Sequence, residues 1–206
     1  MKIAFLGDSI TAGCGASCYD KCYVSLVKNT IACEVKNYGI PATSITKYVR
    51  KAPRPEWYMD FIERAKTIDE DVDYVFVFGG TNDFGHSIEI GALSDTDEYV
   101  FCGAVRSLIS ILSDKFGKEK IRFVLPLRRF GDDIPNPQGA ILKDYIDKLR
   151  LLLDEYNVDY IDLFINGFPK PKTNMGDLYT TDGLHPNDYG HQFVAEIISK
   201  YICEKL

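Results

Sequence analysis

A serine and a histidine are the residues of this sequence whose types suggest nucleophilic chemistry. Ser9 lies near the start of the chain in Gly7-Asp8-Ser9-Ile10, and His185 lies three residues after Asp182 in a compact turn. At that spacing a carboxylate can hydrogen-bond one imidazole nitrogen while the other nitrogen faces a nucleophile. A Gly-Asp-Ser tripeptide alone is more often a turn or a helix cap. The triad of Ser9, Asp182 and His185 is therefore a hypothesis that depends on the rest of the sequence.

Two further segments could supply hydrogen-bond donors. Gly39, in Asn37-Tyr38-Gly39-Ile40, has no side chain to obstruct its backbone N–H. Asn82, in Gly79-Gly80-Thr81-Asn82-Asp83, carries an amide NH₂ that could stabilise a developing oxyanion. These donors can serve Ser9 only if the fold brings all of the segments to one place.

Strands alternating with helices would do so. Five short apolar runs have the character of buried parallel strands, namely residues 2–6, 34–38, 74–78, 121–125 and 160–164. Apolar residues recur at helical spacing between and after them, most clearly over residues 101–112, 141–156 and 193–202, the last behind Pro186, which suits a first helical turn.

This alternation predicts an α/β fold, a three-layer α/β/α sandwich around about five mainly parallel strands. In such folds ligands bind beyond the carboxyl ends of the strands, where the polar segments follow. Two irregular insertions, residues 85–96 and 128–138, are expected on the same side. We expect residues 1–206 to form a single domain.

The four segments, in this order and at these strand ends, resemble the four sequence blocks of the SGNH hydrolase superfamily, the GDSL-type esterases and lipases. By that resemblance Ser9 is the nucleophile and one oxyanion donor, Gly39 and Asn82 are further donors, His185 is the general base and Asp182 completes the triad. The resemblance also implies a flavodoxin-like sandwich, in agreement with the pattern of strands and helices. The short chain is similar to the small bacterial acylhydrolases of this superfamily.

Other polar residues have less specific interpretations. Asp8 is expected to brace its loop by hydrogen bonds rather than to transfer protons. His86 and Arg128 could line the substrate pocket, although Arg128 and Arg129 could equally be a solvated pair. His191 is expected to be structural.

Composition limits the partners. The net charge of −6 argues against nucleic acid, and no apolar run is long enough to suggest a membrane span. The first expected strand follows Met1 directly, which leaves no room for a signal peptide and predicts a cytoplasmic location. The six cysteines are expected to be free thiols, because a chain of this size without a secretory signal keeps its cysteines reduced. The spacing of Cys14, Cys18 and Cys22 matches no zinc pair.

The sequence thus predicts a serine ester hydrolase that needs no cofactor or metal. We expect a small-molecule ester as substrate, with a short acyl group such as an acetyl ester of a carbohydrate or another small alcohol. The alternatives are lysophospholipase or thioesterase activity on longer acyl chains, and a non-catalytic flavodoxin-like ligand-binding module.

Overall fold

A single parallel sheet forms the centre of the molecule. The computed structural model describes residues 1–48 and 59–206. The sheet has the order β2-β1-β3-β4-β5, and all neighbouring strands are parallel. Its strands are β1 (Lys2–Gly7), β2 (Glu34–Gly39), β3 (Tyr74–Phe78), β4 (Ile121–Leu125) and β5 (Tyr160–Asp162). All five predicted strands are therefore confirmed.

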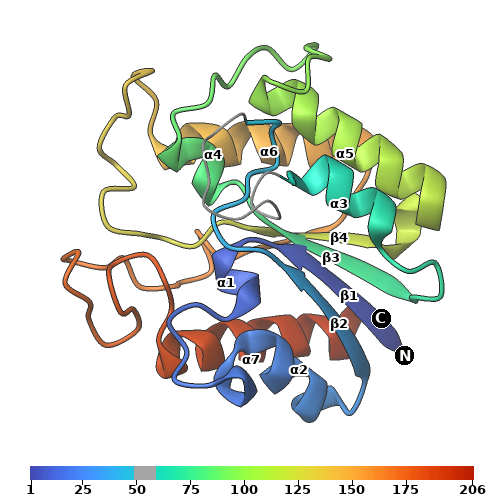
Figure 1. Ribbon diagram of the computed structural model, residues 1–206, viewed down its shortest axis with the longest axis vertical. Helices are drawn as coiled ribbons and strands as arrows, with labels where there is room; N and C mark the ends of the chain where they lie inside the picture. The colour runs from blue at the N-terminus through green and yellow to red at the C-terminus, as the bar shows by residue number, and fades with distance from the viewer. Residues whose placement is uncertain (49–58) are drawn as a thin grey trace.

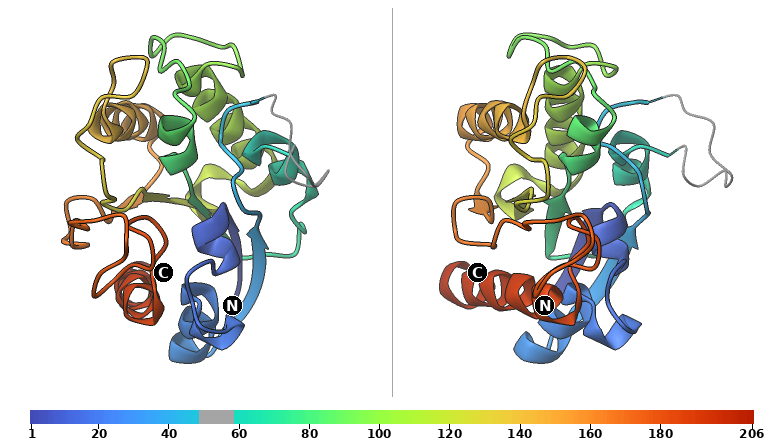
Figure 2. Two further views of the ribbon diagram at one scale, coloured as in Figure 1. Left: turned by 60° about the vertical axis from the view of Figure 1, so that its left-hand side comes forward. Right: turned by 90° about the vertical axis from the view of Figure 1, so that its left-hand side faces the viewer.

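Helices cover both faces of this sheet, so the predicted three-layer sandwich is confirmed. In Figures 1 and 2, α2 (Tyr23–Ile31) and α7 (Asp188–Lys205) lie on one side. The other side carries α3 (Phe61–Thr67), α5 (Phe101–Phe116) and α6 (Leu142–Tyr156). Within residues 1–48 and 59–206, four short helices lie in the connections: α1 (Ser9–Ala12), η1 (Tyr19–Lys21), α4 (Thr81–Gly85) and η3 (Lys118–Lys120).

Alternation along the strands produces two cores. In β1, Ala4 and Leu6 belong to the core beneath α3, α5 and α6, whereas Ile3 and Phe5 belong to the core beneath α2 and α7. Successive side chains of a strand point to opposite faces, and both faces are covered here. This explains why the strands are continuous apolar runs in the sequence.

Several element boundaries differ from the predictions, and two of the differences have a local cause. Strand β5 ends at Asp162 instead of residue 164, because the Asp162 carboxylate accepts a hydrogen bond from the Ile165 N–H at 2.9 Å and starts a turn. The prediction that Pro186 lies in the first turn of the last helix is wrong. Asn187 caps α7 by accepting hydrogen bonds from the N–H groups of Tyr189 and Gly190, so Pro186 precedes the cap.

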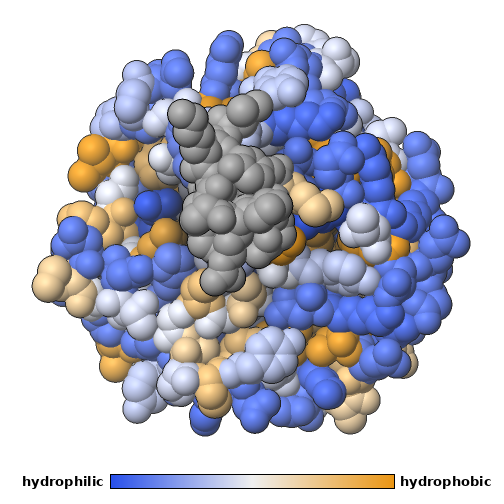
Figure 3. Space-filling model, viewed as in Figure 1, coloured by the Kyte–Doolittle hydropathy of each residue, from blue (hydrophilic) through white to orange (hydrophobic). Residues whose placement is uncertain are grey.

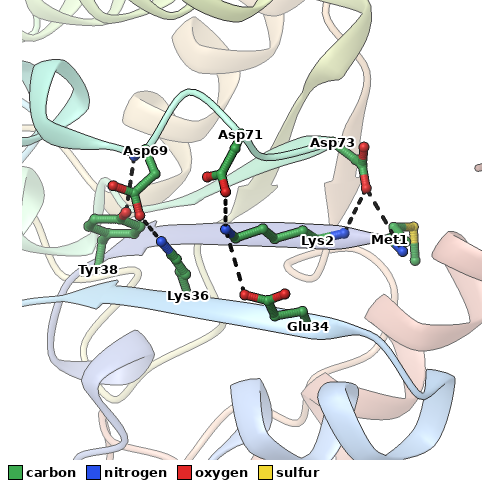
Figure 4. Close-up of polar contacts among 8 residues, drawn as sticks. All are labelled: Met1, Lys2, Glu34, Lys36, Tyr38, Asp69, Asp71 and Asp73. Carbon is green, nitrogen blue, oxygen red and sulfur yellow. Dashed lines mark hydrogen bonds and ion pairs between the residues drawn. The ribbon is translucent and has the colours of Figure 1, made fainter.

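Ion pairs and a backbone hydrogen bond attach the segment between α3 and β3 to the neighbouring strands. Figure 4 shows Asp69 paired with Lys36, Asp71 with Lys2, and Asp73 with the backbone N–H of Lys2. Exposed pairs of this kind contribute only about 0–1 kcal/mol each. We therefore assign them a role in fixing the path of the chain into β3.

Within residues 1–48 and 59–206, no helix combines the length and the apolar character needed to cross a bilayer. On the face shown in Figure 3, hydrophobic residues are interspersed with hydrophilic ones.

Candidate active site

Ser9 is the first residue of α1, directly after the carboxyl end of β1. The Asp8 carboxylate caps this short helix by accepting a hydrogen bond from the Ile10 N–H at 2.9 Å, as the bracing role predicted for Asp8 requires. The turn needs glycine at position 7, because a Cβ there would lie 1.9 Å from Thr11 Oγ1. The chain thus changes from strand to helix within two residues, at Asp8 and Ser9. Ser9 is 6% exposed.

His185 contacts both of its predicted partners. Its Nε2 lies 2.9 Å from Ser9 Oγ, and its Nδ1 lies 2.7 Å from Asp182 Oδ2. The other oxygen of Asp182 accepts hydrogen bonds from the N–H groups of Leu184 at 3.0 Å and His185 at 2.8 Å. The loop between β5 and α7 thereby holds carboxylate and imidazole in one orientation toward the nucleophile.

Two carboxylates at this site, Asp182 and Asp8, have shifted pKa values. Partial burial acts to raise the pKa of Asp182, but hydrogen bonds from the His185 ring and two backbone N–H groups outweigh it and lower that pKa below 3.8. Burial raises the pKa of Asp8 to about 6, against the Ile10 hydrogen bond and the charges of His185 and Arg64. Asp182 is consequently ionised at neutral pH.

Asn82 lies at the carboxyl end of β3, in α4. Its Nδ2 donates to the carbonyl oxygen of Thr43 at 2.8 Å. The next residue, Asp83, is fully buried and accepts hydrogen bonds from the Ile45 N–H and from the N–H and hydroxyl of Thr46. These bonds connect α4 to the loop that follows β2.

The backbone N–H of Gly39 already has an acceptor. It donates to Asn37 Oδ1 at 2.8 Å, while the Asn37 amide donates to the carbonyl of Thr11 at 2.7 Å. A Cβ at position 39 would lie 2.3 Å from the Ala12 nitrogen, so the glycine also permits β2 to approach α1 closely. Ala42, farther along the same loop, has φ 63°, a left-handed conformation that favours glycine.

The two predicted pocket residues have protein partners. Arg128 donates to the buried carboxylate of Asp132 at 2.5 Å, and its guanidinium lies 4.5 Å from the centre of the Phe164 ring. The ring of His86 stacks on that of Tyr48, with centroids 4.7 Å apart. The adjacent Arg129 is nearer to Asn82, since its Nη1 donates to the carbonyl and hydroxyl of Thr81 at 3.3 and 3.2 Å.

His191 is buried beneath the loop that follows α1. Its Nδ1 accepts a hydrogen bond from the Tyr23 N–H at 3.2 Å, and its Nε2 donates to the Cys14 carbonyl at 3.3 Å. Burial lowers the pKa of His191 to about 4, so the ring is neutral. The structural role predicted for it is consistent with these contacts.

None of the six cysteines, all of which lie in the described part of the chain, is paired in a disulfide. Outside residues 49–58, no group of three or more His, Cys, Asp or Glu side chains is arranged to hold a metal ion.

Sequence reasoning did not single out Arg64. This arginine of α3 is 3% exposed, although charged side chains are rarely buried. The signal was its position among the apolar residues Phe61, Ala65 and Ile68, which are also buried. An arginine beside such a stripe must find acceptors within the protein.

A hydroxyl in contact with an imidazole, which a carboxylate orients in turn, can become a nucleophile when the imidazole accepts its proton. The site lies at the carboxyl ends of the strands, where α/β proteins bind their ligands.

Several solved structures share this fold. The chain is similar to a protein from Lactobacillus plantarum, with a TM-score of 0.85, 26% identity, and coverage of 100% of this chain and 97% of the other. A lipase/acylhydrolase from Enterococcus faecalis has a TM-score of 0.68 at 24% identity, with coverage of 98% and 94%. A lipolytic G-D-S-L protein from Veillonella parvula has a TM-score of 0.72 at 20% identity and full coverage of both chains.

The model of the GDSL-like lipase/acylhydrolase family matches residues 5–193. The chain therefore belongs to this family, and membership supports hydrolase activity on esters. No curated protein matches the sequence.

Proposed function

We propose that the protein is a serine ester hydrolase that works through a covalent acyl-enzyme. The observation that most supports this is the 2.9 Å contact between His185 Nε2 and Ser9 Oγ, with Asp182 on the other ring nitrogen. His185 accepts the hydroxyl proton while Ser9 Oγ bonds to the ester carbonyl carbon. When the intermediate collapses, the bond to the alcohol oxygen breaks and His185 returns the proton to that oxygen. Water then attacks the acyl carbonyl carbon while His185 accepts its proton. The bond from the acyl carbon to Ser9 Oγ breaks, His185 returns the proton to Ser9 Oγ, and the acid is released.

In this proposal the Ser9 N–H and the Asn82 amide bind the oxyanion. One N–H of the Asn82 amide donates to Thr43, which fixes the amide plane and orients the second N–H for the substrate. The Gly39 N–H, the third predicted donor, is bonded to Asn37 Oδ1. To bind the oxyanion it must leave this acceptor or donate to both oxygens at once.

The expected substrates are esters of short acyl groups, such as acetyl esters of carbohydrates or other small alcohols. Contacts of His86 and Arg128 with the substrate remain predictions, and we add Arg129 because of its position beside Thr81. A single hydrolase domain and a cytoplasmic location also remain predictions.

One observation favours the alternative of a longer acyl group. A hollow of about 480 Å³ lies between two loops, with Phe130, Ile134 and Pro171 among its lining residues. Phe130 adjoins the predicted triad, because its N–H donates to the carbonyl of Gly183 at 2.7 Å. Asp133, Lys170 and Lys172 also border the hollow, but most of its exposed lining is apolar, which suits a hydrocarbon chain.

A hydrolysis screen tests the proposal. The substrates are p-nitrophenyl esters of increasing chain length together with acetylated sugars, and the enzymes are the wild type and Ser9→Ala. Ser25→Ala is the matched control, because Ser25 is also 6% exposed but lies in α2. We expect Ser9→Ala to lose several powers of ten in kcat with little change in stability, and Ser25→Ala to remain active. Turnover retained by Ser9→Ala would contradict the assignment of the nucleophile.

A further inference from the structure

The guanidinium of Arg64 binds main-chain and side-chain oxygens from several segments of the chain. Its Nη1 donates to the carbonyl of Gly7 at 2.9 Å and to that of Tyr38 at 2.5 Å. Its Nη2 donates to Thr43 Oγ1 at 2.7 Å, and its Nε donates to the Met59 carbonyl at 3.2 Å. We call this set of contacts the Arg64 clamp.

Three of these acceptors belong to the segments that carry the proposed site. Gly7 is two residues before Ser9, at the end of β1. Tyr38 is near the end of β2, and Thr43 lies in the loop that follows it. The carbonyl of Thr43 in turn accepts the hydrogen bond from Asn82. A single side chain thus connects the nucleophile turn to the loop that orients the amide donor.

The clamp requires an arginine rather than any cation. A guanidinium carries five N–H donors in a rigid plane and can serve acceptors in several directions, whereas a lysine ammonium presents three donors from one atom. Burial lowers the pKa of Arg64 to about 10, against the charges of Asp8 and Asp60, so the group is still a cation at neutral pH. A buried cation without these acceptors would be strongly destabilising.

We propose that Arg64 is a positioning residue of the ester hydrolase, which holds the Ser9 turn and the Thr43–Asn82 contact in register for attack and oxyanion binding. This inference rests on the proposed function. Arg64 does not touch the reacting atoms in this scheme. It acts through Gly7, Tyr38 and Thr43, and reaction rates respond steeply to small displacements of reacting groups.

The test compares two buried arginines that both donate to backbone carbonyls. Arg122 is 9% exposed and donates to the carbonyls of Glu119 and Ile121. These lie at the start of β4, at the amino ends of the strands and therefore away from the site at their carboxyl ends. Arg64→Lys and Arg122→Lys are assayed for kcat, KM and urea unfolding, with kcat expressed per molecule titrated by a serine-directed phosphonate. The rate of phosphonylation is a second readout of Ser9 geometry.

We expect Arg64→Lys to lower kcat and the phosphonylation rate together by roughly 10- to 100-fold, with KM changed less than about threefold. Arg122→Lys should lose stability but keep kcat within about twofold of the wild type. Equal kcat values per titrated molecule for Arg64→Lys and the wild type would overturn the inference.

Thr43 provides a milder second test if Arg64→Lys does not fold. Thr43→Val removes the hydroxyl that accepts from Arg64 Nη2, whereas Thr43→Ser keeps it. We expect a kcat loss of roughly 3- to 10-fold for the valine variant and less than about twofold for the serine variant. Equal kcat values for the two would also overturn the inference. Failure of the proposed function is distinguishable, because the wild type would then hydrolyse no ester at all.

Discussion

Replacing His191 by asparagine should change how the stability of the protein depends on pH. The buried His191 ring is neutral in the folded protein, where burial lowers its pKa from 6.5 to about 4. In the unfolded chain the ring is exposed and takes up a proton near pH 6.5. The unfolded state therefore binds more protons between these values, so this residue's contribution to stability is complete above pH 6.5 and is lost as the pH falls toward 4.

The size of this effect follows from the two pKa values. A pH of 5 lies about 1.5 units below the pKa of the imidazole in the unfolded chain. Each unit corresponds to about 1.4 kcal/mol, so protonation of the unfolded chain favours unfolding by about 2 kcal/mol. Asparagine can accept the Tyr23 N–H in place of Nδ1 but does not titrate. The variant should be less stable than the wild type at pH 7.5, and the difference should be about 2 kcal/mol smaller at pH 5.

Urea unfolding of both proteins at pH 7.5 and pH 5 measures this difference directly. Other titrating groups are common to the two proteins and cancel in the comparison. A stability difference that is the same at both pH values, within about 0.5 kcal/mol, would refute the argument that His191 is buried as a neutral ring.

The remaining predictions concern residues around the proposed site. The folded pKa of Asp8, about 6, lies above the ordinary 3.8, so in the wild type a buried carboxylate must ionise as the pH rises from 5 to 7.5. Asp8→Asn should therefore gain about 1.4 kcal/mol in stability relative to the wild type over this range, measured by urea unfolding. No relative gain would contradict this. Asn82→Ala should lower kcat roughly 10²- to 10³-fold with little change in KM in steady-state kinetics. A large loss of stability with kcat intact would instead make Asn82 a brace for its loop. Phe130→Ala should lower kcat/KM for octanoyl esters by more than about fivefold relative to acetyl esters if the hollow binds acyl chains, and an equal effect on both would exclude that role.

The architecture could be predicted because local sequence and fold agree. Strands buried on both faces are short apolar runs, and all five were identifiable on that basis. Ser9, Asn82 and the Asp182–His185 pair could be singled out because each follows a strand, and the carboxyl ends of parallel strands lie at one edge of the sheet.

Contacts that depend on tertiary structure could not be predicted. Arg128 and Arg129 are neighbours with the same chemistry, yet one binds Asp132 and the other Thr81, because their side chains point in different directions. The hydrogen bond from Gly39 to Asn37 and the acceptors of Arg64 likewise come from chain paths that pattern reasoning does not resolve. The helical form of residues Thr81–Gly85 was missed because five residues are too few to show a helical period.

Covalent labelling shows directly whether Ser9 is the nucleophile that His185 activates. A serine-directed phosphonate is incubated with the wild type and with His185→Ala, and the modified peptide is identified by mass spectrometry. We expect a single adduct on Ser9 of the wild type. In His185→Ala we expect labelling slower by several powers of ten, since His185 Nε2 lies 2.9 Å from Ser9 Oγ in the wild type. An adduct on another residue, or equal labelling rates in the two proteins, would contradict the assignment of Ser9 as the nucleophile that His185 activates.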